Sequence, residues 1–271
     1  MDYSLYLEAA KCAAYEAGQA LLHRLGSTLD VRSKSSFDFV TEMDEQSETI
    51  ISSSLLHAFP GHRIMGEEEV SASGLDETAF LEQIDEDCYL WVVDALDGTT
   101  NYIRTIPQFC VSIALIHRRR PVVGVVYNPI SGELFSACLN QGATLNGKPI
   151  HVSDAPDPAH SIFGMGFPAA ELSKRALTMK ALERIHMDFI SMRVYNCAAL
   201  LLCYVACGRL DISFEMGIHL WDMAGGAVIV TEAGGTVTCL NGEPFSIFAK
   251  DNIASNGKYH RQFCEKLNAA M

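Results

Sequence analysis

Positive charge is scarce in this sequence. Its 271 residues carry 20 Lys and Arg against 33 Asp and Glu, which gives a formal net charge of −13. Nucleic acids and anionic membranes bind proteins through basic surfaces, so we expect neither a nucleic-acid partner nor a membrane partner. Part of the acidic excess could belong to a metal site, where bound cations would offset it.

Long apolar runs are also missing. The longest apolar stretch, Cys197–Cys207, is well short of the roughly 20 residues that span a bilayer. Residues 1–18 contain acids and neither a basic start nor a long apolar segment, so no signal peptide is predicted. With 49% hydrophobic and 20% charged residues, the composition indicates a globular protein of one large domain or two fused lobes.

Paired cysteine motifs are absent as well. The nine cysteines are an odd number, and no Cys-x-x-Cys occurs. Several lie in apolar stretches and are predicted to be reduced core residues, namely Cys12, Cys88, Cys110, Cys138 and Cys203. Cys203 and Cys207 share a helix face, but that motif holds no further thiol or imidazole, so no zinc site is expected there. Reduced thiols indicate a cytoplasmic protein.

Helical and strand patterns alternate in the first part of the chain. Helical spacing of apolar residues predicts a first helix that stops near Gly26, with Leu5, Ala9, Cys12, Ala13, Ala17, Ala20 and Leu21 inward. A second helix is predicted from Glu42 to Ala58, followed by short strands at Arg63–Met65 and Leu90–Val93. Turn residues separate three further strands of an antiparallel meander, at Val111–His117, Val122–Tyr127 and Glu133–Cys138, with Arg118–Arg120 at a hairpin tip.

The segment Asp154–His160, rich in Pro and Asp, is the best candidate for a lobe boundary. It would separate an N-terminal α+β lobe, residues 1–155, from a C-terminal α/β lobe, residues 156–271. In the second lobe, strands near Ile162–Gly166 and Ile190–Val194 are predicted to alternate with helices at Leu172–His186, Asn196–Ala206, Asp222–Ala233 and Gly257–Asn268.

Two acidic stretches suggest a magnesium site that faces a phosphate. They are Gly66–Glu69 and Trp91–Asn101. In the second, Asp94 and Asp97 close a predicted buried strand, and the residues from Gly98 onward can turn into a helix with free backbone N–H groups. Mg²⁺ takes oxygen ligands and a phosphate favours a helix N-terminus. In isolation, the same residues are equally typical of a solvated turn with an Asp cap.

Four motifs resemble those of the inositol monophosphatase family, in the family's order. Asp94–Asn101 resembles its Asp-Pro-(Ile/Leu)-Asp-Gly-Thr-Thr-Asn signature, and Gly66–Glu68 its Gly-Glu-Glu element. Glu215–Gly225 is similar to its C-terminal signature, and Lys34–Asp44 to its N-terminal lysine loop. The resemblance implies an α/β protein with the layered αβαβα sandwich of the sugar phosphatase superfamily, in which the active site lies in the cleft between two lobes.

The resemblance further implies a Mg²⁺-dependent phosphomonoesterase that hydrolyses inositol monophosphate, or a related small cyclitol or polyol phosphate, with metal-activated water. Two Mg²⁺ ions per subunit are implied, together with a weaker third. The implied ligands of the first ion are Glu67, Asp94 and the Leu96 carbonyl, and those of the second are Asp94, Asp97 and Asp222. A homodimer and sensitivity to lithium are implied as well.

Catalytic and substrate-binding roles are carried over from the family in the same way. Thr99 and Glu67 resemble the pair that orients and deprotonates the attacking water, with Asp94 bridging both ions. The implied substrate contacts are Gly98, Thr99, Asn196, Cys197, Ala198, Glu215 and Asp222. Among these, the backbone N–H groups of Gly98 and Thr99 would hold the phosphate, and Glu215 would accept hydrogen bonds from cyclitol hydroxyls.

Three acids near these motifs leave alternatives open. Glu68 fits either a position behind the metal ligands or a solvated side chain. Asp44 and Glu48, four residues apart on a predicted helix, could hydrogen-bond metal-bound water or belong to an ordinary exposed face.

Two predicted roles are also possible for each of two basic side chains, Lys34 and His219. Lys34, in a predicted loop with Ser33, Ser35 and Ser36, is predicted to be a mobile lid contact near the metals, with a surface lysine as the alternative. His219, beside Trp221, is predicted to be packed and hydrogen-bonded instead of a metal ligand.

Two departures from the family pattern bear on the substrate. Ala95 stands where the family has proline, and Asn196-Cys197 stand where it has Gly-Ser or Gly-Thr. By resemblance the second pair lines the sugar side of the pocket, so we expect broad activity on small polyol or cyclitol phosphates. Alternative functions are a phosphatase for histidinol phosphate, fructose-1,6-bisphosphate or a nucleotide 3′-phosphate, and a regulatory binding protein of transcription or RNA processing with residual phosphatase activity.

Overall fold

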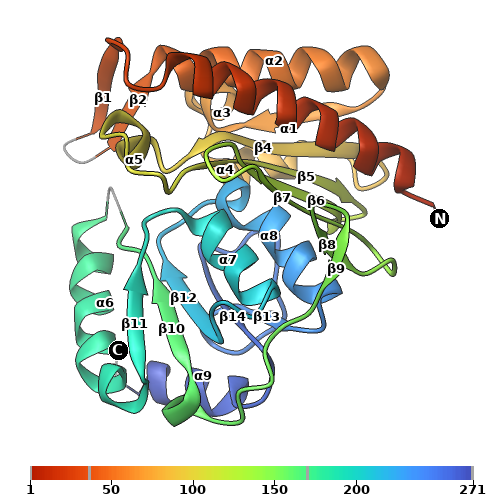
Figure 1. The fold of residues 1–271 in the computed structure, drawn as a ribbon. Coiled ribbons are helices and arrows are strands. Elements are labelled where there is room, and N and C mark those ends of the chain that lie inside the picture. The colour runs from red at the N-terminus through yellow and green to blue at the C-terminus, as the bar shows by residue number, and fades with distance from the viewer. Residues whose placement is uncertain (1, 36–37, 169–170, 270–271) are drawn as a thin grey trace.

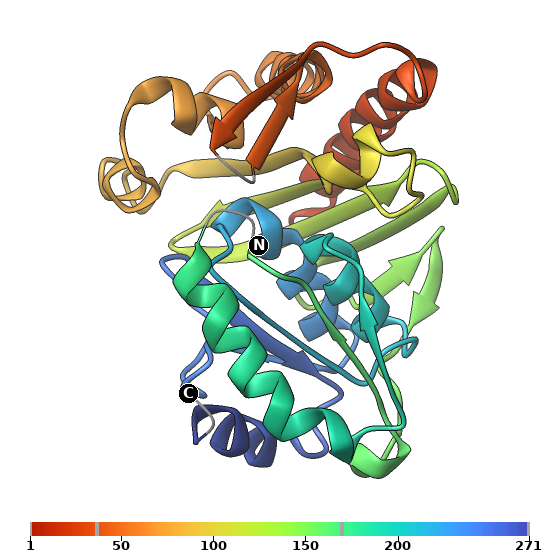
Figure 2. The same cartoon turned by 90° about the vertical axis from the view of Figure 1, so that its left-hand side faces the viewer.

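Five layers of helices and sheets form the molecule (Figure 1). The computed structural model describes residues 2–35, 38–168 and 171–269. Helices α1 (Ser4–Arg24) and α2 (Glu42–Ala58) cover the outer face of a seven-stranded sheet. Helices α7 (Ala198–Ala206) and α8 (Leu220–Glu232) lie between this sheet and a five-stranded sheet, which α6 (Leu172–Ile185) and α9 (His260–Asn268) cover from the far side (Figures 1 and 2). The αβαβα sandwich is therefore confirmed.

The seven-stranded sheet contains the predicted meander. Its strands follow one another in chain order, with β3 parallel to β4 and the remaining pairs antiparallel. The bounds are β3 (Arg63–Gly66), β4 (Tyr89–Asp97), β5 (Cys110–His117), β6 (Arg120–Asn128), β7 (Glu133–Cys138), β8 (Ala143–Leu145) and β9 (Lys148–Ile150). The predicted hairpin tip is correct, because Arg118 and Arg119 take positive φ values of 52° and 57° between β5 and β6.

The five-stranded sheet has the order β11-β10-β12-β14-β13. Its strands are β10 (Ile162–Met165), β11 (Ser191–Val194), β12 (Ile212–Met216), β13 (Thr236–Thr238) and β14 (Asp251–Ser255). β10 runs parallel to both neighbours, and β14 runs antiparallel to β12 and β13. The sequence predicted only β10 and β11. The strand β12 is buried along its whole length, so it lacks the alternation by which a half-buried strand is recognised.

Several short elements were not predicted. They are the hairpin strands β1 (Val31–Ser35) and β2 (Asp38–Thr41), the helices α3 (Glu67–Ser73) and α4 (Glu77–Glu82), and the 3₁₀ turns Pro158–His160 and His186–Asp188. The helical turn expected after Gly98 is confirmed as α5 (Thr99–Ile103). The segment of Lys34, expected to be a loop, is therefore mostly a β-hairpin. Its tip, residues 36–37 with the predicted loop residue Ser36, lies outside the described residues.

Helix α2 begins and ends at the predicted residues. Thr41 caps it by accepting the Met43 N–H at 3.1 Å, and Asp44 accepts the Thr41 N–H at 2.8 Å in return. In α1 the prediction of the inward face was partly wrong, because Leu5 is 70% exposed and Cys12 is exposed. The buried face consists mainly of small residues, Ala10, Ala13, Ala14, Ala17, Gly18 and Leu21, which let the helix approach the sheet closely.

All nine cysteines are free thiols. Cys110, Cys138 and Cys203 are buried as predicted, whereas Cys88 is only partly buried. Within the described parts of the chain, none of the helices has both the length and the apolar composition needed to cross a bilayer.

Candidate metal and phosphate site

The end of β4 carries the two aspartates of the central motif. The ladder between β4 and β5 shifts its register between Asp94 and Asp97, so a bulge separates two carboxylates that both still belong to the strand. The predicted end of the strand at Val93 was therefore too early. Gly98 follows with a φ of 90°, and a Cβ there would lie 2.8 Å from the Gln108 carbonyl oxygen. Backbone geometry thus requires glycine at this turn, which adds to the phosphate access expected from the sequence.

Four predicted metal ligands come together around Asp94. Glu67 begins α3, Asp97 ends β4, and Asp222 lies in the first turn of α8. Burial raises the pKa of Asp94 well above its usual range, and the charges of Glu67, Asp97 and Asp222 raise it further. Burial likewise raises the pKa of Asp222 to about 7, with the charges of Asp97 and Glu67 adding to the effect. The chain thus gathers carboxylates from three separate elements.

These groups fit a hard divalent cation. All four side chains offer carboxylate oxygens, which are the ligands that Mg²⁺ takes in proteins. Burial raises the pKa values of Asp94, Asp97 and Asp222, and a cation among these carboxylates would favour their charged forms. The fifth predicted ligand, the Leu96 carbonyl, lies in the bulge, where the Leu96 N–H donates to Asp94 Oδ1 at 2.9 Å.

Thr99 pairs with Asp44. Its hydroxyl lies 3.0 Å from Asp44 Oδ1 and 3.1 Å from the Leu96 carbonyl oxygen, and its one proton can serve either acceptor. The other Asp44 oxygen accepts the N–H of Thr41 at 2.8 Å and its hydroxyl at 2.7 Å. Burial raises the pKa of Asp44 to about 7, against the opposing effect of these hydrogen bonds. The sequence predicted that Thr99 acts together with Glu67. In the structure the Thr99 hydroxyl lies beside Asp44 instead.

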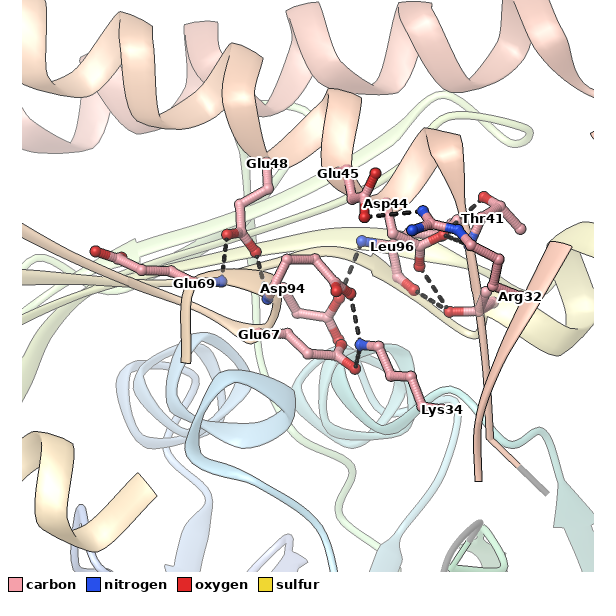
Figure 3. Close-up of polar contacts among 12 residues, drawn as sticks. Arg32, Lys34, Thr41, Asp44, Glu45, Glu48, Glu67, Glu69, Asp94 and Leu96 are labelled. Atoms are coloured by element: carbon pink, nitrogen blue, oxygen red, sulfur yellow. Dashed lines mark hydrogen bonds and ion pairs between the residues drawn. The ribbon is translucent and has the colours of Figure 1, made fainter. Parts of the chain in front are cut away.

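Glu48 holds the start of α3. Its two carboxylate oxygens accept the backbone N–H groups of Glu68 and Glu69, each at 2.9 Å (Figure 3). Gly66 makes room for this contact, because a Cβ there would lie 2.2 Å from the Glu48 carboxylate carbon. Asp44 and Glu48 are only 5% and 8% exposed, so the alternative of an ordinary exposed helix face was wrong for both.

Lys34 reaches the acidic cluster from β1 (Figure 3). Its ammonium group lies 2.8 Å from Glu67 Oε1 and 2.6 Å from Glu68 Oε1. Burial works against the Lys34 charge, yet the two carboxylates raise its pKa above the ordinary value. The side chains of Lys34 and Glu68 are 19% and 16% exposed, so neither the surface lysine nor the solvated glutamate describes them.

Asp97 is held at the start of α7. Its Oδ2 accepts the Ala199 N–H at 2.7 Å, and the thiol of Cys197 lies 3.2 Å from the same oxygen. Cys197 is 1% exposed, so its thiol faces this carboxylate and not the open side where the sequence placed it. Asn196 is exposed and takes a φ of 52°, a conformation that asparagine tolerates better than most residues. Ala198, the first residue of α7, is buried at 7% exposure.

Glu215 lies on β12 and is 6% exposed. Burial raises its pKa well above the ordinary value, and the charges of Asp97 and Asp222 raise it further. The carboxylate of Glu215, a predicted substrate ligand, therefore interacts electrostatically with Asp97 and Asp222 of the metal site.

The sequence missed one buried acid that orders the site. Glu77 on α4 is 4% exposed and accepts the Leu220 N–H at 2.8 Å, the His219 ring at 2.9 Å and the Lys250 ammonium group. The His219 N–H donates to Asp222 Oδ2 at 2.7 Å, so α4 secures the helix start that presents Asp222. No local signal marks Glu77, because its partners lie far along the chain.

The prediction for His219 itself is confirmed. Its ring bonds to Glu77 and stacks on Trp221, with the ring centroids 4.5 Å apart and the planes within 10°.

Comparison with known proteins places this geometry in context. The sequence profile of the inositol monophosphatase family matches residues 2–271. Inositol monophosphatase 3 of Solanum lycopersicum is 40% identical over 266 residues, which cover 97% of this chain and 96% of the relative. Nus factor SuhB of Xylella fastidiosa is 38% identical over 232 residues, or 85% of this chain and 80% of that protein.

Solved structures agree with the sequence relatives. The extragenic suppressor protein suhB of Bartonella henselae aligns with a TM-score of 0.88 at 32% identity, covering 98% of this chain and all of that one. The inositol monophosphatase of Anabaena aligns with a TM-score of 0.85 at 34% identity, covering all of this chain and 98% of the other.

Proposed function

Because the chain belongs to the inositol monophosphatase family, and is thus a phosphoric monoester hydrolase of the inositol-phosphate phosphatase type, we propose that it hydrolyses inositol monophosphate or a related small cyclitol or polyol phosphate in the presence of Mg²⁺. The observation that carries the proposal is the gathering of Glu67, Asp97 and Asp222 around Asp94, beside the Thr99–Asp44 pair. Acids drawn from three elements into one largely buried cluster serve a cation far better than they serve stability.

Glu67, Asp94, Asp97, Asp222 and the Leu96 carbonyl would hold two ions, with Asp94 shared between them and Glu67 available to a weaker third. When bound there, Mg²⁺ supplies charge neutralisation for the phosphoryl oxygens and acidifies water. The protein contributes the arrangement of these ligands. Glu48 fixes α3 and hence Glu67, while Glu77 and His219 fix the start of α8 and hence Asp222.

Thr99 and Asp44 would orient the attacking water and move its proton. The Thr99 hydroxyl can accept a hydrogen bond from water while it donates to Asp44. With a pKa of about 7, the Asp44 carboxyl is suited to take up and return a proton near neutral pH. The two Thr41 contacts keep Asp44 in place while its other oxygen faces Thr99. We therefore assign to Asp44 the proton-accepting role that the sequence gave to Glu67.

The phosphate and alcohol sides of the substrate would be bound by different elements. Backbone N–H groups of Gly98 and Thr99, at the start of α5, would bind the phosphate, since the first N–H groups of a helical turn have no partner within it. Glu215 would accept hydrogen bonds from ring hydroxyls, and Asn196 and Ala198, at the start of α7, would contact the same part of the substrate. Asn196 is the exposed member of its pair, so the polyol specificity would depend on this side chain more than on Cys197.

The proposal is tested by phosphate release from a panel of substrates. Inositol 1-phosphate, other cyclitol and polyol phosphates, histidinol phosphate, fructose-1,6-bisphosphate and a nucleoside 3′-phosphate would each be assayed with Mg²⁺ and with EDTA. We expect Mg²⁺-dependent turnover that is highest for the cyclitol and polyol phosphates, inhibition by millimolar Li⁺, and a dimeric mass by light scattering. Preference for the nucleotide or bisphosphate, or turnover in EDTA, would contradict the proposal.

A second candidate function follows from the relatives named Nus factor SuhB. Such a protein would bind components of transcription or RNA processing in addition to, or apart from, turnover. The net charge of −13 favours a basic protein partner over direct contact with nucleic acid. Absence of Mg²⁺-dependent turnover on the whole panel, with retained Mg²⁺ binding, would favour this role.

A further inference from the structure

A pair of buried thiols lies directly behind Asp97. Cys110 begins β5 and is paired with Asp97 across the ladder to β4, while Cys197 immediately precedes α7. The two sulfur atoms are 3.7 Å apart, and they lie 3.8 Å and 3.2 Å from Asp97 Oδ2. All three residues are buried, at 0%, 1% and 7% exposure.

These three distances match one face of a tetrahedral zinc site. Zn–S bonds of about 2.3 Å and Zn–O bonds of about 2.0–2.2 Å place two sulfur ligands about 3.8 Å apart and a sulfur and an oxygen about 3.5–3.6 Å apart. The observed separations are 3.7 Å for the sulfur pair, and 3.2 Å and 3.8 Å for the two sulfur–oxygen pairs. The side chains therefore need to move by only a few tenths of an ångström to share one ion.

The donor set differs from that of the magnesium site. Thiolates are soft ligands that select zinc and similar ions, whereas Mg²⁺ takes oxygen. Among the described residues, these three form a group in which one oxygen and two sulfur ligand atoms all lie within 4.8 Å of one another. The backbone N–H of Ala199, at the positive end of α7, would help to hold the negative charge that two thiolates and a carboxylate bring to the ion.

We propose that Asp97, Cys110 and Cys197 form a second metal site, selective for Zn²⁺ or another thiophilic divalent cation, that shuts off the magnesium site. Binding releases one proton from each thiol to solvent and leaves a complex of two thiolates and one carboxylate. The effect on activity rests on the function proposed above. Binding of Zn²⁺ would inhibit phosphate release, because Asp97 cannot orient fully toward both ions.

Binding of Co²⁺ can be followed by absorption spectroscopy, so the proposed site can be detected without any measurement of turnover. Co²⁺ replaces zinc in sites of this kind, and thiolate ligation produces an intense ligand-to-metal charge-transfer band in the near ultraviolet. Titration of the full-length protein with Co²⁺, without added Mg²⁺, should raise this band to a plateau at one thiolate-bound ion per chain. Zn²⁺ should then bleach it stoichiometrically.

Two variants decide whether these thiols are the ligands. Cys110→Ala should abolish the band and weaken Zn²⁺ binding by more than about 100-fold, as expected when a direct ligand is lost. Cys138→Ala, which removes an equally buried thiol from β7, is the matched control and should keep both. Unfolding curves of each variant would establish that it is folded before binding is compared.

The possible outcomes separate the two proposals. A parent protein without the charge-transfer band, or a band that persists in Cys110→Ala, overturns the zinc site even if phosphatase activity is found. The band with its predicted loss in Cys110→Ala supports the site even if no substrate is turned over. Where turnover exists, the Zn²⁺ concentration for half-inhibition, measured relative to each protein's own uninhibited rate, should rise at least tenfold in Cys110→Ala and remain unchanged in Cys138→Ala.

Discussion

Asp44→Asn should lower the rate of catalysis without destabilising the protein. Asparagine has the same shape as aspartate, and its carbonyl oxygen can accept both Thr41 contacts while its amide donates to the Thr99 hydroxyl. Packing and hydrogen bonding are then kept. What is lost is the acceptor for the Thr99 proton, so we expect kcat to fall by about 10²–10⁴, the usual contribution of general acid–base catalysis.

The same substitution should raise the stability of the protein at neutral pH, although it lowers kcat. The Asp44 pKa rises on folding from the ordinary 3.8 to about 7, so the folded state binds more protons than the unfolded chain between these values. Stability therefore falls as the pH rises through this window, by at most about 4 kcal/mol at 1.36 kcal/mol per pKa unit. Asparagine removes this cost. The metal-free variant should match the parent near pH 4 and exceed it by a few kcal/mol above pH 7.

Urea unfolding in EDTA from pH 4 to 8 measures the difference, and initial rates at saturating Mg²⁺ measure kcat. Glu45→Gln is the control, since Glu45 lies on the same helix with a half-exposed side chain paired to Arg32. The reasoning is refuted if Asp44→Asn keeps kcat within tenfold of the parent, or if its stability relative to the parent does not change with pH.

Four further substitutions test the remaining roles. Asp94→Asn should abolish turnover while the protein stays folded, because Asp94 is the ligand proposed to bridge both ions; activity within tenfold of the parent at saturating Mg²⁺ would exclude that role. Thr99→Ala should lower kcat strongly with KM near the parent value; a raised KM with kcat intact would make Thr99 a phosphate ligand only. Asn196→Gly should raise the preference for inositol 1-phosphate over other polyol phosphates, whereas Cys197→Ser should leave it unchanged. Equal substrate profiles for the parent and Asn196→Gly would mean that Asn196 does not contact the alcohol.

Much of the fold could be predicted because its signals are local. The Thr41 cap and the apolar spacing that follows fix α2 at both ends, and turn residues delimit the meander. By contrast, β12 lacks alternation because both its faces are covered, and β13 has only 3 residues. The hairpin of β1 and β2 is mostly polar, and only the folded structure reveals how its two strands pair.

The candidate site was predictable to the extent that its residues lie within motifs. The sequence named the acids at Glu67, Asp94, Asp97 and Asp222, and the structure draws them together. It could not show that Glu48 binds backbone groups of α3 or that Glu77 secures α8, because these contacts join segments far apart in the chain.

The two thiols next to Asp97 could not be predicted from the sequence for the same reason. Cys110 and Cys197 are separated by 87 positions, and neither belongs to a recognisable metal motif. A residue pattern identifies ligands that are close along the chain, whereas this pair is brought together only by the ladder of β4 with β5 and the start of α7.

Placing α7 and α8 between the two sheets has a consequence for the order of folding. A chain that has completed only the seven-stranded sheet presents Glu67, Asp94 and Asp97 but still lacks Asp222 and the N–H groups of α7. Closing the long intervening loop is entropically costly and belongs to the slow, non-local steps of folding. On the proposed function, Mg²⁺ would bind only once α8 has packed against the sheet. We therefore expect Mg²⁺ to slow unfolding and to leave the rate of folding almost unchanged.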